Sequence, residues 1–455
     1  MAARYGSVRA SSWGLRLRGS SVIIGLPVVE QIPNLVKETR RHAAVRTDCY
    51  LYSQLIPYIG NKRKLLPLIA EAIAKTGVRG GLFVDLFSGG GVVSRLAKQI
   101  GFAVVSNDWE PYAFEIANCY VGCNRRPEFA ALGGANAIFE HLNQLAPVEG
   151  YVCRHLCPAD DFAPDHARDR MFFTRRNGAR IDAIREQIAQ WDAAGLLDRL
   201  ERSYLLGPLL FGVSYVSNTS GVFKGFHRGW GGATHTALYR ILSDLKLVAP
   251  ILLDNARDNT VWRLDAQEAA ERLRSRDTLV DIAYLDPPYN QHPYGSNYHV
   301  LNTVALWDKP AVSPVITEGD KSAIRLDWRT ERRSAYNYAS RAADAYDQLV
   351  ETLPARTVLT SYSTDGNIPL DELIERSSRH GRLSCVMNAY KRYRVSAQRM
   401  SAKPVNVEFV LIIDKCARPN ARAGEMVRDA ILRREDNALR AHPESAARGL
   451  EIGFE

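Results

Sequence analysis

The sequence predicts an α/β protein with a doubly wound, mainly parallel sheet. Three observations predict it: short apolar segments alternate with helical ones, several of these segments end in an aspartate, and a glycine-rich turn follows the first of them. In such sheets, ligands bind at the carboxyl ends of the strands. One edge of the sheet is therefore predicted to carry four aspartates, namely Asp85, Asp108, Asp265 and Asp286.

The composition is that of an ordinary globular protein and excludes several classes. The chain has 455 residues, of which 46% are hydrophobic and 24% are charged, so two or three folding units are expected. It has no run of about 18 consecutive apolar residues, so neither a transmembrane helix nor a membrane partner is expected. The seven cysteines are an odd number, which is not typical of a secreted disulfide framework and indicates a reducing, cytoplasmic setting.

The charge balance permits a polyanionic partner without requiring one. The chain has 59 Lys and Arg residues against 50 Asp and Glu residues, which gives a net charge of +9. When charge is considered alone, an alkaline enzyme that binds no nucleic acid is the commoner explanation.

The first 50 residues differ from the rest of the chain. They are rich in Arg and Ser and contain no acidic residue before Glu30. This composition predicts a disordered, non-essential extension, with a mitochondrial-type targeting segment or a misplaced start codon as the alternatives. The fold is therefore expected to begin near Leu51, ahead of a Gly-Asn turn and an amphipathic helix over 65–73.

The strongest local signal is a strand, a glycine turn and a helix in succession. An apolar strand over 81–87 leads into the turn at 88–91, and a helix begins at Val92. This arrangement lets backbone amides and a helix N-terminus approach a ligand closely. The next strand, 102–106, precedes Asp108, where an acid typically holds the ribose of a nucleoside-containing cofactor. The glycines lack the full G-x-G-x-x-G spacing of NAD enzymes, which disfavours a dehydrogenase.

Residues 120–250 show no alternation of strands and helices and predict a mainly helical insertion. The candidate phosphate contacts are Arg175, Arg176, Arg180, Arg185, Lys224, His227 and Arg228, and the candidate base contacts are Asn218, Thr219 and Ser220. For each charge, a solvated surface residue is the alternative. Four cysteines form two C-x3-C pairs, Cys119 with Cys123 and Cys153 with Cys157. Structural zinc sites mainly place two residues between thiols, so no metal is predicted and buried thiols are favoured.

The alternating pattern resumes after residue 250. Asp265 stands at a strand end before a short helix, and residues 279–285 are apolar except for Asp281, as expected of a central parallel strand. Two more short strands are expected within 356–366 and 408–414, with a helix over 346–353 before the first of them. The tail, 416–455, contains a charged segment over 423–442 that predicts a surface helix.

Taken in order, the segments YIGNK, FVDLFSGGG, SNDWEPY, RLDA and AYLDPPY resemble the D12 class of N6-adenine-specific DNA methyltransferases. The resemblance covers roughly residues 51–414. It implies a Rossmann-like, S-adenosylmethionine-dependent methyltransferase sheet built from 51–119 and 251–415, with an inserted target-recognition domain at 120–250. Asp-Pro-Pro-Tyr by itself also occurs in N4-cytosine and some RNA methyltransferases, so these two acceptors remain alternatives.

The resemblance also implies roles for single residues. The cofactor-binding set comprises Tyr58, Lys62, Asp85, Phe87, Ser88, Gly89, Asp108 and Asp265. Tyr58 and Lys62 would hold the methionine part of S-adenosylmethionine, Asp108 its ribose and Asp265 its adenine amino group. Asn61 departs from the family pattern, which has a glycine at this position.

The predicted catalytic residues are Asp286, Pro287, Pro288 and Tyr289. An exocyclic adenine amine is a poor nucleophile because its lone pair is delocalised into the ring. Asp286 and the Pro287 carbonyl would each accept one N–H, with the carbonyl direction fixed by the locked φ of proline. No metal and no covalent enzyme intermediate are needed. The target base would leave the duplex and stack on Tyr289.

Residues 291–299 follow this motif and contain Tyr294 and Tyr298. These side chains would close over the flipped base or fill the space that it leaves, and an ordinary surface loop is the alternative. The expected function is DNA adenine-N6 methylation by a monomer in the bacterial cytoplasm, on double-stranded DNA and beside a cognate restriction endonuclease. The alternative from a different class is a catalytically silent DNA-binding module, which the intact motif disfavours.

Overall fold

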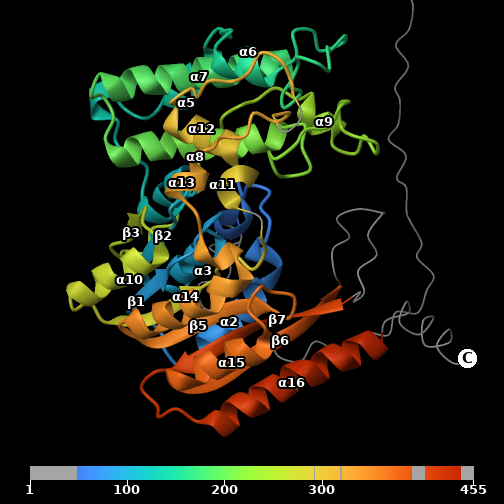
Figure 1. Cartoon of the computed structure of the whole chain (residues 1–455). Coiled ribbons are helices and arrows are strands. Elements are labelled where there is room, and N and C mark those ends of the chain that lie inside the picture. The colour runs from blue at the N-terminus through green and yellow to red at the C-terminus, as the bar shows by residue number, and fades with distance from the viewer. Residues whose placement is uncertain (1–48, 292, 318–319, 392–404, 442–455) are drawn as a thin grey trace, which may run out of the picture. The chain divides into compact units, whose positions relative to one another are not determined.

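A seven-stranded sheet organises the described part of the chain, which in this computed structural model comprises residues 49–291, 293–317, 320–391 and 405–441 (Figure 1). The strands are β1 (Leu82–Asp85), β2 (Ala103–Asn107), β3 (Thr260–Trp262), β4 (Val280–Leu285), β5 (Ala355–Ser363), β6 (Arg382–Lys391) and β7 (Val405–Asp414). Their spatial order is β3-β2-β1-β4-β5-β7-β6. The first five of these pair in parallel, and β7 runs antiparallel to β5 and β6.

This mixed α/β fold with a mostly parallel sheet confirms the predicted class in its general form. Strand β6 was not anticipated, because its sequence alternates polar and apolar residues and it lies at an edge of the sheet. The chain proceeds from β1 to β2 and β3 on one side and from β4 to β5 on the other. The topological switch point therefore lies between β1 and β4, where α/β sheets bind their ligands.

Helices cover both faces of the sheet. Phe83 and Ile282 pack toward α2 (Leu66–Lys75) and α3 (Val92–Ile100). Their chain neighbours Val84 and Ala283 belong to the opposite apolar layer, which contains α10 (Ala266–Ser275), α14 (Ala339–Thr352) and α15 (Leu370–Arg379). Because alternate residues of a strand face opposite sides, burial on both faces requires the continuous apolar runs seen in the sequence.

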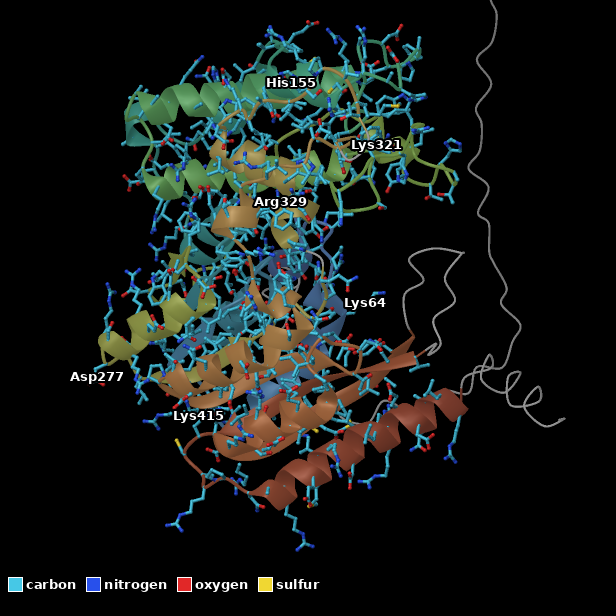
Figure 2. All side chains as sticks on the ribbon, in the orientation of Figure 1. Lys64, His155, Asp277, Lys321, Arg329 and Lys415 are labelled. Carbon is cyan, nitrogen blue, oxygen red and sulfur yellow. The ribbon has the colours of Figure 1, made fainter. Side chains whose placement is uncertain are left out.

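The end of β7 is tied to the neighbouring helix layer. Lys415 donates hydrogen bonds of 2.7 Å to the carbonyls of Val350 and Leu353, at the end of α14 (Figure 2). The tail helix predicted from the sequence is α16 (Ala421–Arg440), which packs on β6 and α15 and buries Val427 and Ile431.

A second group of helices has an apolar core of its own (Figure 1). It comprises α4 (Pro111–Ala117), α5 (Ile138–Gln144), α6 (Tyr151–Leu156), α7 (Arg175–Ala193), α8 (Arg199–Val216), α9 (Leu238–Ile241) and α12 (His299–Leu306). Helices α4 and α12 lie outside the predicted insertion, so its apolar core extends beyond residues 120–250. The cysteines Cys119, Cys123, Cys153 and Cys157 are all buried.

Shorter elements complete the described chain. They are η1 (Lys62–Leu65), η2 (Asn118–Gly122), η3 (Ala130–Leu132), α11 (Tyr294–Asn297), α13 (Trp328–Glu331) and η4 (Ala335–Asn337). Within the described ranges, no helix is long and apolar enough to cross a membrane. Of the predicted N-terminal extension, residues 1–48 lie outside the described residues, and Tyr50 is buried with its hydroxyl donating to the Tyr120 carbonyl. Residues 442–455 of the tail also lie outside the described residues.

Candidate functional site

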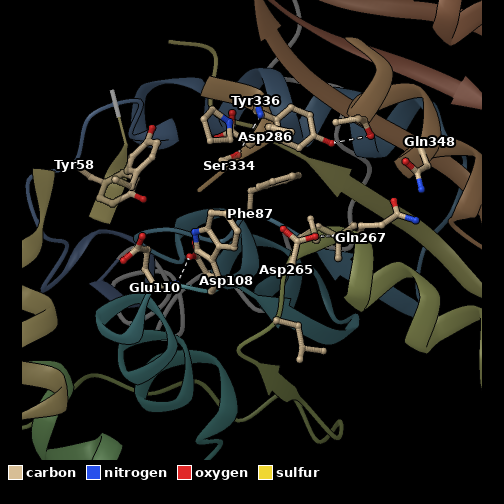
Figure 3. Close-up of a pocket in the computed structure, with 18 residues that line it drawn as sticks. Tyr58, Phe87, Asp108, Glu110, Asp265, Gln267, Asp286, Ser334, Tyr336 and Gln348 are labelled. Atoms are coloured by element: carbon tan, nitrogen blue, oxygen red, sulfur yellow. Dashed lines mark hydrogen bonds between the residues drawn. The ribbon is translucent and has the colours of Figure 1, made fainter. Parts of the chain in front are cut away.

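A cavity of about 260 Å³ opens beside the carboxyl ends of β1, β2 and β4 (Figure 3). Its walls include three of the four predicted acids, Asp108, Asp265 and Asp286. The predicted cofactor residues Tyr58 and Phe87 also line it. Tyr58 lies at one end of the cavity and Asp265 at the other, with Phe87 between them. The fold therefore brings the ends of several strands to one site, as the strand pattern predicts.

Asp286 directly follows β4 and is paired with a buried lysine. Lys62 Nζ lies 2.8 Å from Asp286 Oδ1, and the two side chains are 4% and 16% exposed. Burial raises the pKa of Asp286, and Lys62 opposes this shift. Burial alone would lower the pKa of Lys62, but Asp286, Tyr289 and Glu408 together raise it above its usual value, so the lysine stays charged. The pair therefore holds an anion at the cavity wall with a cation behind it.

The other predicted catalytic residues adjoin this pair. Pro288 lines the cavity, whereas Pro287 and Tyr289 are not among its lining residues. The Lys62 ammonium lies 5.1 Å from the centroid of the Tyr289 ring, which also meets Tyr362 edge to face. Tyr289 is thus held beside the acid on which the predicted chemistry depends.

The glycine turn after β1 contacts the next acid directly. Gly89 has a φ of +48° and donates its N–H to Asp108 Oδ2 over 2.8 Å. A Cβ at this position would lie 2.8 Å from the Tyr58 ring, so only glycine fits both the conformation and the space. Ser88 Oγ is buried without a hydrogen-bond partner among the described residues, which leaves a polar atom available beside the turn.

Asp108 and Asp265 are each positioned by backbone hydrogen bonds. Burial raises the pKa of Asp108 to about 6, opposed by the N–H groups of Glu110 and Gly89. Asp265 is the N-cap of α10, where it accepts the N–H of Gln267 and forms a capping box with Glu268. Burial also raises the pKa of Asp265. The sequence motif at this strand end therefore serves both the helix start and the cavity wall.

Asp85 does not line the cavity. Its side chain is buried and accepts a 2.7 Å hydrogen bond from the Ser94 hydroxyl in α3. Burial raises the pKa of Asp85 to about 7, and the Ser94 hydrogen bond opposes the shift. Asp85 thus connects the end of β1 to α3, and the prediction that it forms part of the cavity wall is not met.

Replacing Asp85 with asparagine is expected to stabilise the protein at alkaline pH. The pKa of Asp85 is about 7 in the folded chain and about 3.9 when unfolded. The folded state therefore binds this proton more tightly, and its contribution to the free energy of unfolding is lost as the pH rises from about 4 to about 7. Asparagine keeps an acceptor for Ser94 without the charge, so the gain at pH 8 should be roughly 1–3 kcal/mol and should vanish near pH 4.

Urea unfolding at the two pH values measures this difference. The exposed Asp277, in the turn before β4, provides the matched control (Figure 2). Asp277→Asn should leave the pH dependence of unfolding unchanged. An Asp85→Asn protein whose stability follows the wild-type pH dependence would refute the assignment.

Several cavity residues were not predicted from the sequence, and Glu110 and Tyr336 are the two with the clearest contacts. Glu110 is buried in the wall, accepts a 2.6 Å hydrogen bond from Asn302 and lies 3.5 Å from Arg332 Nε. Burial raises the pKa of Glu110 to about 7, opposed by Arg332. Tyr336 meets Phe87 edge to face at 5.4 Å. Glu110 could have been found from its place two residues after Asp108, whereas Tyr336 belongs to the short helix η4, which no strand or glycine signal marks in the sequence.

Three tyrosines pack together beside the cavity. Tyr298 is fully buried, stacks on Tyr58 at 4.9 Å and accepts the N–H of Ile59. Tyr294 stacks on Tyr58 at 5.2 Å and lines the cavity. The prediction that Tyr298 closes over a base or belongs to a surface loop is therefore wrong, because its ring and hydroxyl are both used in the core.

Asn61, where the chain departs from the family pattern, stabilises the turn before η1 with its own side chain. Its side-chain oxygen accepts the N–H of Arg63 at 2.8 Å and caps η1. The preceding Gly60 has a φ of +74°, and a Cβ there would lie 3.3 Å from the hydroxyls of Tyr289 and Tyr294. Glycine is therefore required at residue 60, and a side-chain cap takes over at residue 61.

Several predicted DNA contacts are structural instead. Arg185 is buried and donates to the Val304 carbonyl, and Asn218 is buried and donates to the carbonyls of Met171 and His227. These two predictions are contradicted, because neither side chain can reach DNA. Arg180 donates to two backbone carbonyls, and Arg175 and Arg176 form ion pairs with Glu149 and Asp244. Lys224, Arg228 and Ser220 are exposed, His227 is partly exposed and Thr219 is buried.

The residues around the cavity fit a nucleoside-containing cofactor. Carboxylates at Asp108 and Asp265 can accept hydrogen bonds from hydroxyl and amino groups. Phe87 and Tyr336, which meet edge to face, both offer aromatic surface to the cavity. Among the described residues, no group of three or more His, Cys, Asp or Glu side chains is placed to hold a metal ion.

A mostly parallel sheet with an acid-lined cavity at its switch point and an Asp-Pro-Pro-Tyr turn is the arrangement of a DNA methyltransferase. The chain belongs to the D12 class N6 adenine-specific DNA methyltransferase family, whose model matches residues 58–315.

Curated relatives agree with this membership. The chain is 28% identical over 363 residues to the type II methyltransferase M.NlaIII of Neisseria lactamica, covering 79% of this chain and 99% of that protein. It is 30% identical over 347 residues to the type II methyltransferase M.FokI of Planomicrobium okeanokoites, covering 76% of this chain and 50% of that protein. It is 29% identical over 370 residues to the modification methylase LlaI of Lactococcus lactis subsp. lactis, covering 79% and 54%. The chain therefore spans nearly all of the first relative and about half of the other two.

Proposed function

We propose that this enzyme methylates the N6 amine of an adenine flipped out of duplex DNA, with S-adenosylmethionine as the donor. It would act as a monomer in the bacterial cytoplasm, as the modification partner of a restriction endonuclease. One observation carries the proposal: the buried Asp286 carboxylate, paired with Lys62, lies in the wall of a cavity that also contains Asp108 and Asp265. The relatives with modification-methylase names support the biological setting.

The acceptor half of the proposed site comprises Asp286 and the turn after it. The Asp286 carboxylate accepts one N–H of the adenine amine and the Pro287 carbonyl accepts the other, which concentrates the nitrogen lone pair toward the donor. Lys62 keeps Asp286 ionised in its buried position. Tyr289 and Tyr294 provide aromatic faces near this acid, and base stacking offsets part of the cost of flipping.

The donor half extends along the cavity from Tyr58 past Phe87 to Asp265. Asp108 would hold the ribose hydroxyls, Asp265 the adenine amino group, and Tyr58, Lys62, Ser88 and Gly89 the methionine end. When bound, S-adenosylmethionine supplies a methyl group on a positively charged sulfur, which the N6 lone pair takes with release of a neutral thioether and one amine proton. The chain contributes placement and charge, which are the main sources of catalysis when no covalent intermediate forms.

The helical region serves, in this proposal, as the target-recognition domain. It covers residues 120–250 together with α4 and α12, which share its apolar core. The exposed Lys224 and Arg228 would contact phosphates of the double-stranded DNA. Because α12 follows Asp286 by a short segment, this domain and the acceptor half of the site are directly connected.

The proposed activity is tested with duplex DNA and methyl-labelled S-adenosylmethionine. The nucleoside digest is expected to carry label in N6-methyladenine. Label found only in N4-methylcytosine, or only in RNA offered in place of DNA, would assign the same fold to one of the alternative acceptors. Binding of the cofactor and DNA without any transfer would indicate a silent DNA-binding module.

Asp108→Asn is expected to weaken S-adenosylmethionine binding by about tenfold or more, because an amide replaces a charged acceptor for two ribose hydroxyls. Isothermal titration calorimetry measures the dissociation constant. Asp258→Asn changes the same residue type at an exposed position and should bind the cofactor as the wild type does. Equal affinity of Asp108→Asn and wild type would remove Asp108 from the cofactor site.

A further inference from the structure

A second cavity lies beside the first, in the helical region. It encloses about 550 Å³ between the C-terminal end of α8, the turn at 219–221 and the glycine-rich segment 231–237. Pro57 is one of its lining residues, whereas the next residue, Tyr58, lines the catalytic cavity. One short stretch of chain without regular structure therefore separates the two cavities.

The lining of the second cavity combines apolar surface with polar side chains. Leu55, Pro57 and Phe211 supply the apolar part. Ser220 and His227 supply a hydroxyl and an imidazole, and neither side chain makes a hydrogen bond to another described residue. Free polar groups beside apolar surface match a nucleobase, which has flat apolar faces and an edge of donors and acceptors.

The wall of this cavity is fixed by hydrogen bonds of two side chains, the buried Asn218 and the half-buried Arg240. Asn218 Nδ2 donates to the His227 carbonyl at 3.0 Å, and its Oδ1 accepts the N–H of Gly231 at 3.1 Å. Arg240 donates to the carbonyls of Ser217 and Thr219 at 2.9 and 3.3 Å. Asn218 joins the turn after α8 to His227 and Gly231, and Arg240 joins the same turn to α9. The cavity is therefore formed before any ligand arrives. Preorganisation of this kind is typical of binding sites.

Gly232 leaves the space that the His227 ring occupies in the cavity wall. Gly232 has a φ of +64°, and a Cβ there would lie 3.0 Å from the imidazole. A side chain at residue 232 would therefore displace the ring from the cavity wall.

The surroundings of the cavity favour a nucleic acid over a neutral small molecule. The exposed cations Lys224 and Arg228 flank His227 in the sequence. Two exposed tyrosines adjoin the lining: Tyr215 belongs to it, and Tyr239, next to the lining residue Arg240, is 72% exposed. Exposed cations interleaved with aromatic rings are typical of surfaces that hold a phosphate backbone and stack bases.

We propose that this second cavity takes a nucleobase of the DNA substrate other than the target adenine and reads its edge through His227 and Ser220. The inference rests on the proposed function, because DNA is the source of the base. It assigns sequence selectivity to a cavity whose lining residue Pro57 directly precedes Tyr58, a lining residue of the catalytic cavity. Asn218 acts as a positioning residue outside the lining, whereas Arg240 both holds the turn after α8 and lines the cavity.

The test begins by sequencing the modified positions in DNA from cells that express the wild type, which defines the recognition sequence. Methylation is then measured on the cognate duplex and on duplexes with one base pair changed. His227→Ala is expected to lower kcat/KM for the cognate duplex by roughly 10- to 100-fold and to abolish discrimination at one position. Ser220→Trp, which places a bulky ring in the cavity lining, should have the same effect.

A control variant in the same loop distinguishes loss of base recognition from misfolding of the loop. His235 lies in the same segment outside the lining and has a φ of +51°, which asparagine tolerates. His235→Asn should keep wild-type selectivity, and an equal loss in this variant would overturn the inference. Inhibition of the wild type by free deoxynucleoside monophosphates that disappears in His227→Ala would assign the cavity to a free nucleotide and also overturn it.

The two possible failures can be told apart. A wild-type enzyme that methylates no DNA contradicts the proposed function itself. An active wild type whose selectivity survives both His227→Ala and Ser220→Trp contradicts only the reading role of the second cavity.

Discussion

Asp286→Ala is expected to lower kcat for methyl transfer by about 10²- to 10³-fold, with cofactor binding largely intact. The carboxylate is the only charged acceptor that the proposal places on the adenine amine, and loss of such a group typically costs 10²- to 10³-fold. Asp286→Asn keeps the shape of the side chain but removes the charge, so it should be nearly as inactive. Single-turnover transfer and calorimetry with S-adenosylmethionine measure the two effects separately.

Stability has to be followed in the same variants. Asp286→Ala leaves the Lys62 ammonium buried without its partner, which typically costs about 3–5 kcal/mol in the free energy of unfolding. Asp286→Asn retains an oxygen for Lys62 and is the better folded probe. Asp277→Asn, on the exposed turn before the same strand, is the control and should retain full activity. Undiminished turnover by a folded Asp286→Asn enzyme would remove Asp286 from its role.

Lys62→Met is expected to shift the acidic limb of the pH–rate profile to higher pH. Burial raises the pKa of Asp286 and Lys62 opposes that shift, so removal of the cation lets the pKa rise further. Transfer requires the carboxylate, and activity is lost as the pH falls through this pKa. The variant should therefore lose about 10²-fold in kcat near pH 6 and recover part of the loss toward pH 9.

Measurement of kcat against pH distinguishes this role from a structural one. Lys62→Arg keeps the charge and should leave the acidic limb close to its wild-type position, whatever its effect on the maximum rate. The Lys62→Met/Asp286→Asn double variant no longer contains the buried pair, so its stability loss should be smaller than the sum of the single losses. If Lys62→Met lowers kcat by the same factor at every pH, the acidic limb has not moved. Lys62 would then serve only to bind the cofactor.

The sequence alone determined the elements on which the site depends. Apolar runs that are buried on both faces, such as Val280–Leu285, can hardly form anything but central parallel strands. The turn at 88–91 and the Asp-Pro-Pro-Tyr motif mark two strand ends, because each is incompatible with continuing the strand. In a doubly wound sheet the strand ends share one edge, so the sequence predicts that Asp108, Asp265 and Asp286 lie together, and all three line the cavity.

Only the tertiary structure decided how each side chain is used. The surroundings of a side chain depend on which segments pack against it. Asp85 is therefore bonded to Ser94, whereas Asp108, Asp265 and Asp286 face the cavity. The same reason explains why Arg185, Asn218 and Tyr298 looked like DNA contacts in the sequence yet belong to the core. Polar residue types in a loop indicate that partners exist, but not whether those partners are DNA or the backbone of the same chain.

Contacts between segments that are distant in the sequence could not be predicted from it either. The pair Lys62–Asp286 joins residues on either side of the whole helical region, and no periodicity relates them. Glu110 contacts Asn302, in α12, and Arg332, which follows α12 in the sequence. Tyr336 also follows α12 and contacts Phe87. Strand and helix signals are local because they arise from backbone geometry. The cavities are non-local, because their walls come from segments that only packing brings together.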